Sequence, residues 1–127
     1  MSFSMSKILV VEDEPNVRKL VAVNLIKRGH QVLEAENGQK ALEHLYEQKP
    51  ELVVLDIKLP DLSGWEILDR LQSLKALPSD LRVLVMTATP VDPDVVLRKY
   101  PHVTEILVKP FNLDMLIAAT QRALKKN

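Results

Sequence analysis

The 127-residue chain contains no cysteine, which excludes a disulfide framework, a thiolate zinc site and cysteine catalysis. Aromatic residues make up only 4% of it, too few for a platform that stacks the bases of single-stranded nucleic acid. Its 17 basic and 17 acidic residues cancel, so no net charge attracts nucleic acid or an anionic membrane. We therefore expect no nucleic-acid partner through this domain and no membrane partner. The lack of cysteine also fits a reducing, cytoplasmic location.

Long hydrophobic runs are absent as well. No apolar run approaches the ~18 residues of a membrane span, and the run over 8–11 is too short for a signal peptide. The hydrophobic content of 46% nevertheless supports a folded core, and the length predicts a single domain. Residues 1–6 carry no pattern, and we expect a disordered tail or a cloning remnant there. This leaves 7–127 as the folded domain.

Short aliphatic runs alternate with segments in which apolar residues recur at helical spacing. The runs predict strands over 8–11, 31–36, 52–57, 82–86 and 105–108, each followed by a helical segment. Strands joined through helices run parallel, and right-handed crossovers place helices on both faces of the sheet. Five such units predict an α/β fold with an open, doubly wound, five-stranded parallel sheet, because a closed barrel needs about eight units.

The helices carry recognisable start and stop signals. Ser63 and Glu66 have the spacing of a capping box, and other helices begin near proline or asparagine. The fourth helix is unusual, because Pro90 and Pro93 remove two backbone donors and delay its start. Tyr100 precedes another proline and ends it. We therefore predict a short, displaced fourth helix and an atypical surface around it.

Polar residues stand where the strands end. Glu12 and Asp13 end the first strand, Asp56 ends the third, Thr87 ends the fourth and Lys109 ends the fifth. In the strand order 2-1-3-4-5 the first and third strands are neighbours, so three carboxylates converge at the carboxyl edge of the sheet. Such a cluster needs a cation, and oxygen ligands without histidine or cysteine favour Mg²⁺. A carboxylate, a divalent cation, a lysine and a hydroxyl are the groups required to transfer a phosphoryl group onto an aspartate.

The same segments resemble a known family over nearly the whole chain. Four segments occur in the order and at the spacing found in the receiver domain of two-component response regulators. They are Val10–Pro15, Pro50–Gly64, Thr87–Ala88 and Lys109–Phe111. The resemblance implies a flavodoxin-like receiver fold. It also implies that Asp56 accepts phosphate from a phosphohistidine, carried by a sensor histidine kinase or a phosphotransfer protein. The domain is then a phosphorylated switch rather than an enzyme, with at most self-phosphorylation from small donors and self-dephosphorylation.

The resemblance further implies the ligands of the magnesium ion. Asp13 and Asp56 bind Mg²⁺ through their carboxylates, and the main-chain carbonyl of Lys58 adds a ligand. Glu12 acts mainly through water.

Other residues are expected to hold the phosphoryl group. Lys109 pairs with its oxygens, Thr87 turns inward to bind them, and the main-chain amide of Ala88 contributes to the same site. The bond before Pro110 is expected to be cis.

One position departs from the family pattern. Relatives commonly carry an aromatic residue three positions before the strand-end lysine, and it changes rotamer on activation, whereas this sequence has Ile106 there. Any switch is therefore expected to act mainly through Thr87 and its loop. The output is either a downstream protein partner or a domain missing from this sequence, since the sequence does not distinguish a stand-alone regulator from part of a longer protein.

Other functions fit the sequence less well than a phosphorylated switch. A phosphatase of the haloacid-dehalogenase type needs an aspartate at the position of Lys58, and a flavodoxin-like cofactor binder needs a phosphate loop where Glu12–Glu14 stand. Neither G-x-G-x-x-G nor G-x-x-x-x-G-K-[ST] occurs, which removes dinucleotide-binding and P-loop functions. The runner-up is a receiver-like interaction scaffold that works without phosphorylation, which Ile106 and the interrupted fourth helix favour.

Overall fold

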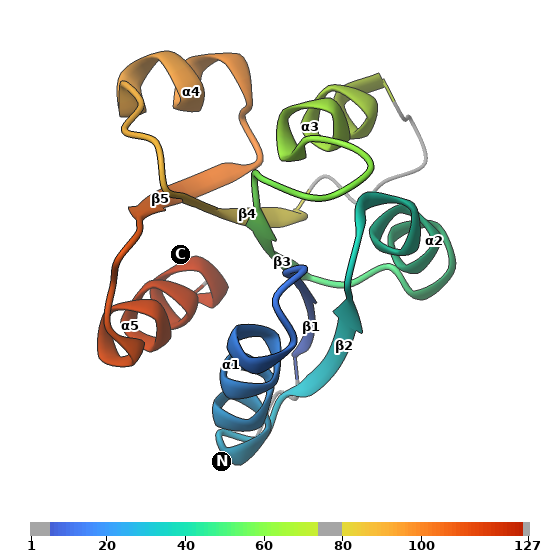
Figure 1. Cartoon of the computed structure of the whole chain (residues 1–127), viewed down its shortest axis with the longest axis vertical. Helices are drawn as coiled ribbons and strands as arrows, with labels where there is room; N and C mark the ends of the chain where they lie inside the picture. Colours follow the sequence, from blue (N-terminus) through green and yellow to red (C-terminus); the bar gives the residue numbers. More distant parts are fainter. Residues whose placement is uncertain (1–5, 74–79, 126–127) are drawn as a thin grey trace.

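The computed structural model describes residues 6–73 and 80–125. Strands and helices alternate throughout this part of the chain (Figure 1). The strands are β1 (Lys7–Val11), β2 (Gln31–Ala35), β3 (Leu52–Asp56), β4 (Arg82–Thr87) and β5 (Val103–Val108). The helices are α1 (Pro15–Lys27), α2 (Gly38–Gln48), α3 (Gly64–Ser73), α4 (Pro93–Lys99) and α5 (Leu113–Leu124). Of the tail predicted over 1–6, residues 1–5 lie outside the described residues, and the carbonyl of Ser6 accepts a hydrogen bond from Gln31 at 2.9 Å.

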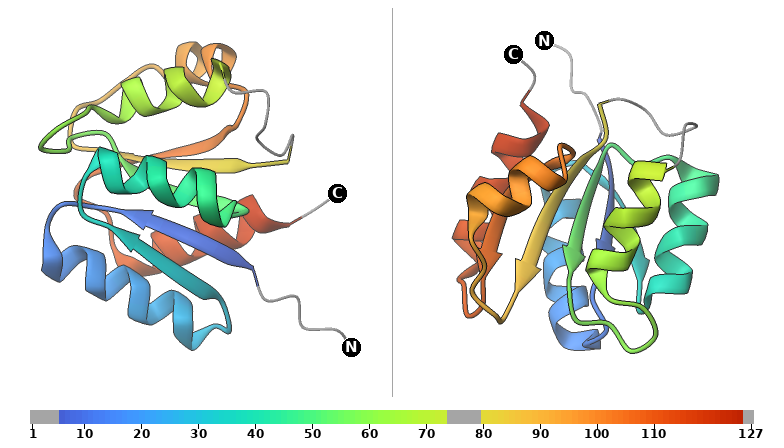
Figure 2. Two further views of the ribbon diagram at one scale, coloured as in Figure 1. Left: turned by 90° about the vertical axis from the view of Figure 1, so that its right-hand side faces the viewer. Right: turned by 90° about the horizontal axis from the view of Figure 1, so that it is seen from above.

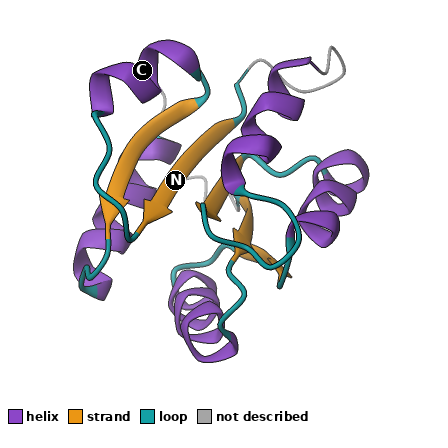
Figure 3. Ribbon diagram, turned by 45° about the horizontal axis from the view of Figure 1, so that its top comes forward, coloured by secondary structure: helices purple, strands orange, loops and turns teal. Residues whose placement is uncertain are grey.

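The five strands form one parallel sheet with the order β2-β1-β3-β4-β5. Helices α1 and α5 cover one face, and α2, α3 and α4 cover the other, so the sheet is the middle of three layers (Figures 2 and 3). This confirms the predicted fold class and strand order. None of the described helices is long and apolar enough to cross a membrane.

The sheet separates two hydrophobic cores. In β1, Leu9 and Val11 face the core under α2, α3 and α4, whereas Ile8 and Val10 face the core under α1 and α5. All four side chains are fully buried, which is why this strand reads as a continuous apolar run rather than as an alternating one. A slip of one residue would exchange every side chain between the two cores, so burial fixes the register.

The predicted helix caps are present. Ser63 Oγ accepts the Glu66 N–H at 3.2 Å, and Glu66 Oε1 accepts the Ser63 N–H at 3.4 Å, which confirms the capping box. Asn37 and Asn112 cap α2 and α5 through their side-chain oxygens. Asp92 caps α4 by accepting the Asp94 N–H at 3.0 Å.

Helix α4 has 7 residues, fewer than any other described helix, which confirms its predicted shortness; its displacement stays a prediction. The fifth strand was predicted to begin at Glu105 but begins at Val103. Val103 pairs with Val83, ahead of a register irregularity between Val83 and Leu84, and the polar Thr104 and Glu105 separate it from the apolar run over 106–108.

The C-terminal end of α4 is attached to α3 through side chains. Tyr100 is 4% exposed; its ring stacks on Trp65 with centroids 5.9 Å apart, and its hydroxyl donates to Asp69 Oδ1 at 2.8 Å. The Gln72 side-chain amide donates to the carbonyl of Lys99. The residue that ends α4 therefore also fixes that end of the helix against α3.

Replacing Tyr100 with phenylalanine should lower the free energy of unfolding by about 1 kcal/mol, the usual net contribution of one hydrogen bond. The ring stack on Trp65 is kept, and only the bond to Asp69 is lost. Denaturant unfolding followed by the fluorescence of Trp65, the sole tryptophan, measures the change. Asp69→Ala, which removes the acceptor, and the double variant complete the cycle, and strictly additive effects would contradict a direct bond.

His30 lies in the turn between α1 and β2, and its Nδ1 is buried without a hydrogen-bond partner among the described residues. Burial lowers the pKa of His30 below its ordinary value, with Glu51 opposing and Arg28 reinforcing that shift. The folded protein therefore favours the neutral ring. The contribution of the neutral His30 ring to stability is therefore fully present above the pKa that His30 has in the unfolded chain. It is lost as pH falls through the pKa that His30 has in the folded protein.

We accordingly expect His30→Gln to lose less stability than the parent between pH 7 and pH 5. The difference should be small, because the His30 ring is partly exposed to solvent. Urea unfolding across this pH range is the measurement, with His44→Gln as the matched histidine control. Parallel pH profiles for the parent and His30→Gln would contradict the expectation.

Candidate functional site

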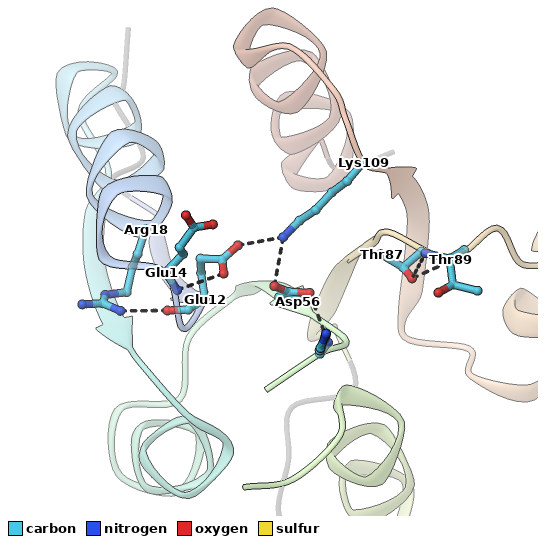
Figure 4. A network of polar contacts seen from close by, with 8 residues as sticks. Glu12, Glu14, Arg18, Asp56, Thr87, Thr89 and Lys109 are labelled. Carbon is cyan, nitrogen blue, oxygen red and sulfur yellow. Dashed lines mark hydrogen bonds and ion pairs between the residues drawn. The ribbon is translucent and has the colours of Figure 1, made fainter. Parts of the chain in front are cut away.

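Four strands of the sheet bring polar side chains to its carboxyl edge (Figure 4). Glu12 and Asp13 follow β1, Asp56 ends β3, Thr87 ends β4 and Lys109 follows β5. Because β3 lies between β1 and β4, its last residue occupies the middle of this edge. Most strand residues before them are apolar and buried between the helices, so the polar side chains gather where the strands end.

The three carboxylates converge as predicted. Glu12, Asp13 and Asp56 each offer an oxygen, and these oxygens lie within 4.8 Å of one another. Glu12 and Asp56 are 1% and 4% exposed, whereas Asp13 is open to solvent. Oxygen donors with one solvent-facing side suit Mg²⁺, which retains part of its water shell. The residues present thus fit the implied cation.

The Lys109 ammonium lies between two of these carboxylates. Its Nζ is 3.0 Å from Glu12 Oε1 and 3.0 Å from Asp56 Oδ2. Burial lowers the pKa of Lys109, but the hydrogen bonds that its Nζ donates to Asp56 and Glu12 outweigh burial and raise that pKa above its ordinary value. Burial raises the pKa of Glu12 to about 7, against the opposing contacts with Lys109 and the Glu14 N–H. Lys109 is therefore a cation that partly offsets the repulsion within the acidic cluster.

Thr87 is close to this group in the fold, but its hydroxyl is engaged elsewhere. The hydroxyl donates to the Thr89 carbonyl at 3.1 Å and accepts the Thr89 N–H at 3.1 Å. Figure 4 shows both threonines on the β4 side of the site, with no dashed line to Asp56. Ala88, between them, is exposed.

The remaining predicted residues lie around this centre. Lys58 has an exposed side chain, while its backbone N–H donates to Asp56 Oδ1 at 3.1 Å. The bond between Lys109 and Pro110 is cis, as predicted. Ile106 is partly buried against the core under α2, α3 and α4, so it presents no aromatic ring to the site.

Sequence reasoning missed two residues that hold the site's loops. Asp61 accepts the Gly38 N–H at 2.7 Å and the Gln39 N–H at 2.9 Å, which attaches the loop after β3 to the start of α2. Burial alone would raise the pKa of Asp61, but these backbone donors lower it. Arg18 contacts the end of β1. An aspartate after a proline and an arginine inside a helix are common, so no local pattern marked either one.

The chain is similar to proteins of one known family over nearly its whole length. The protein-family model described as "Response regulator receiver domain" matches residues 8–121 of the chain. Transcriptional regulatory protein KdpE of Mycobacterium tuberculosis is 33% identical over 123 residues, which cover 97% of this chain and 53% of that protein. The chain thus spans about half the length of KdpE. Sporulation initiation phosphotransferase F of Bacillus subtilis is 34% identical over 118 residues, 93% of each chain.

Solved structures agree with this result. The response regulator TrrA of Thermotoga maritima, crystallised in complex with Mg(2+)-BeF, is 33% identical with a TM-score of 0.76, covering 94% of this chain and 100% of that one. The non-phosphorylated HemR receiver domain of Leptospira biflexa is 25% identical with a TM-score of 0.83, covering 96% of each. Together with the acidic cluster at the carboxyl edge of the sheet, these matches show that the chain belongs to the response regulator receiver domain family, whose members are signalling phosphoacceptors rather than catalytic enzymes.

Proposed function

We propose that this receiver domain accepts a phosphoryl group on Asp56, in a Mg²⁺-dependent transfer from a phosphohistidine. The observation that carries the proposal is the environment of the Asp56 carboxylate. It is nearly buried, it lies within reach of two further carboxylates, and Lys109 contacts it at 3.0 Å. Two nearly buried carboxylates beside a third, exposed one are costly without a cation, and stability alone gives no reason for such a cluster.

Asp13, Asp56 and the main-chain carbonyl of Lys58 would hold the Mg²⁺, with Glu12 acting through water. The bound ion supplies positive charge that offsets the charge on the transferring phosphoryl group. An Asp56 carboxylate oxygen forms the new bond to phosphorus as the bond from phosphorus to the histidine nitrogen breaks. The electron pair leaves with the imidazole, which takes up a proton. Lys109 keeps its charge and orients the phosphoryl oxygens.

Phosphorylation would then change the Thr87 loop. The Thr87 hydroxyl would leave Thr89 and bind a phosphoryl oxygen, with the Ala88 amide as a second donor. Because Ile106 cannot swap an aromatic ring between inward and outward positions, the signal would leave through this loop and α4.

The partners follow from this role. The donor would be a sensor histidine kinase or a phosphotransfer protein, and the receiver of the signal would be a downstream protein or an output domain in the same polypeptide. An apolar cavity of about 490 Å³ opens between α1 and α5 beside Lys109 and offers the donor a place to dock. We also propose that residues 7–127 form the folded receiver domain and that the protein acts in the cytoplasm.

Intact mass measurement after incubation with acetyl phosphate and Mg²⁺ tests the proposal. We expect one phosphoryl group per chain, lost in Asp56→Asn and with a chelator, and kept in Asp114→Asn, which alters an exposed aspartate on α5. Folded protein that stays unlabelled by acetyl phosphate and by a phosphohistidine donor would contradict the proposal. That outcome would favour the interaction scaffold, the function that Ile106 and the short α4 support.

A further inference from the structure

Arg18 connects three elements next to the acidic cluster. Its Nη1 donates to the main-chain carbonyl of Glu12 at 2.8 Å, and its Nε donates to Glu34 Oε1 at 3.2 Å. The Arg18 side chain lies on α1 and is 15% exposed, while Glu34 lies on β2. Figure 4 shows the guanidinium directed at the Glu12 backbone, on the opposite side of that residue from Lys109.

The carbonyl that Arg18 contacts belongs to the peptide unit joining Glu12 to Asp13. A peptide unit is planar, so fixing its carbonyl fixes the plane from which the next residue departs. The N–H of Glu12 is already held by the Ala35 carbonyl at 3.0 Å. Strand β1 ends at Val11, and the Glu12 carbonyl, just beyond it, finds a donor in Arg18.

The guanidinium is itself held in place. Glu34 accepts from Arg18 through one oxygen and from Lys19 through the other, at 3.0 Å. A planar guanidinium with donors in a fixed fork can hold a carboxylate and a carbonyl together, which a single ammonium does less well. The end of β1 is thereby attached to both α1 and β2.

From this geometry we propose that Arg18 is a positioning residue for the cation site. It holds the peptide between Glu12 and Asp13 in the orientation that directs both carboxylates to one metal ion. This inference rests on the proposed function, because it assumes that the acidic cluster binds Mg²⁺. The inference adds Arg18 to the residues on which the site depends, although Arg18 would contact neither the ion nor the phosphoryl group.

Losing the charge of Arg18 and losing its positioning contacts would change the affinity for Mg²⁺ in opposite directions, so a single measurement distinguishes the two effects. Arg18 is a cation near a cation site, so removing its charge would by itself tighten Mg²⁺ binding. Loss of positioning would weaken it, and residues that support metal ligands typically contribute about 10–100-fold in affinity. We expect Arg18→Met to bind Mg²⁺ about tenfold more weakly than the parent chain, despite the lost positive charge.

The experiment is calorimetric titration of the whole chain with Mg²⁺ alone, at a temperature where circular dichroism shows each variant folded. Lys19→Met is the matched control, because it removes a neighbouring charge from the same Glu34 carboxylate without contacting Glu12; its affinity should be unchanged or slightly higher. Arg18→Met binding Mg²⁺ as tightly as the parent would overturn the inference. If Arg18→Met does not fold, Arg18→Lys decides: weaker binding supports positioning and unchanged binding overturns it. A parent chain that does not bind Mg²⁺ would remove the proposed function and this inference together.

Discussion

Lys109→Met is expected to lower the free energy of unfolding of the metal-free protein by about 2 kcal/mol. Removing one partner of a fully buried ion pair costs about 3–5 kcal/mol, and we take a smaller value because the Lys109 side chain is 28% exposed. The carboxylates it leaves behind are much less accessible, with the Glu12 and Asp56 side chains 1% and 6% exposed. Methionine retains most of the apolar stem, so the loss reports mainly on the charge.

The same variant should respond more strongly to Mg²⁺ than the parent does. Without Lys109, no side-chain ammonium among the described residues contacts the acidic cluster, so an added cation relieves more repulsion. Urea unfolding, once with a chelator and once with saturating Mg²⁺, gives the free energy of unfolding of each protein without and with the ion. Lys40→Met, which removes a surface ion pair with Glu43, is the control and should change stability by less than about 1 kcal/mol. A chelated Lys109→Met as stable as the parent would show that Lys109 does not offset this cluster.

Gly64→Ala is expected to lower the free energy of unfolding by about 2–3 kcal/mol, at the upper end of the usual cost of overpacking a core. A Cβ at Gly64 would lie 2.8 Å from Ile57 Cα, 2.7 Å from Ile57 Cδ1 and 3.1 Å from the Asp56 carbonyl. The Gly64 N–H also donates to the Ile57 carbonyl at 2.7 Å, so the two backbones cannot separate without losing that bond. The clash falls directly beside the proposed phosphoacceptor.

We therefore expect Gly64→Ala to label more slowly with acetyl phosphate as well, at a temperature where it remains folded. Gly29→Ala is the matched control, because Gly29 has φ +91° but its added Cβ would meet nothing within 4 Å. It should lose about 1 kcal/mol from backbone strain and label at the parent rate. Equal labelling of Gly64→Ala and the parent would show that the β3–α3 loop tolerates the displacement.

The fold was predictable because its determinants are local in the sequence. Apolar runs such as Leu52–Leu55 mark strands buried on both faces, and caps such as Asn37 and Asn112 mark where helices begin. The parallel topology then placed Glu12, Asp13 and Asp56 at one edge without any knowledge of side-chain positions. The acidic cluster followed from strand order alone, since the end of a parallel strand is determined by its direction.

The parts that could not be predicted depend on contacts between distant segments. Asp61 binds backbone groups 22 and 23 residues earlier in the chain, and Tyr100 meets Trp65 across two helices. The sequence indicated that Tyr100 ends α4, but not that its ring is buried against α3. Likewise Thr87 was expected near the site, whereas its bonds to Thr89 depend on the loop conformation. A side chain's partner is set by packing, which no periodicity encodes.

The unequal burial of the five strands has a consequence for amide hydrogen exchange. Every residue of β3 is buried, whereas most residues of β2 and β5, at the two edges of the sheet, are only partly covered. Backbone amides in β3 should therefore exchange only through global unfolding, while those in the edge strands exchange through local opening. Asp56 thus ends a slowly exchanging strand, and one strand separates it from each of the faster-exchanging edge strands β2 and β5. Local opening at either edge of the sheet can therefore occur without moving the buried strand that holds Asp56 in place.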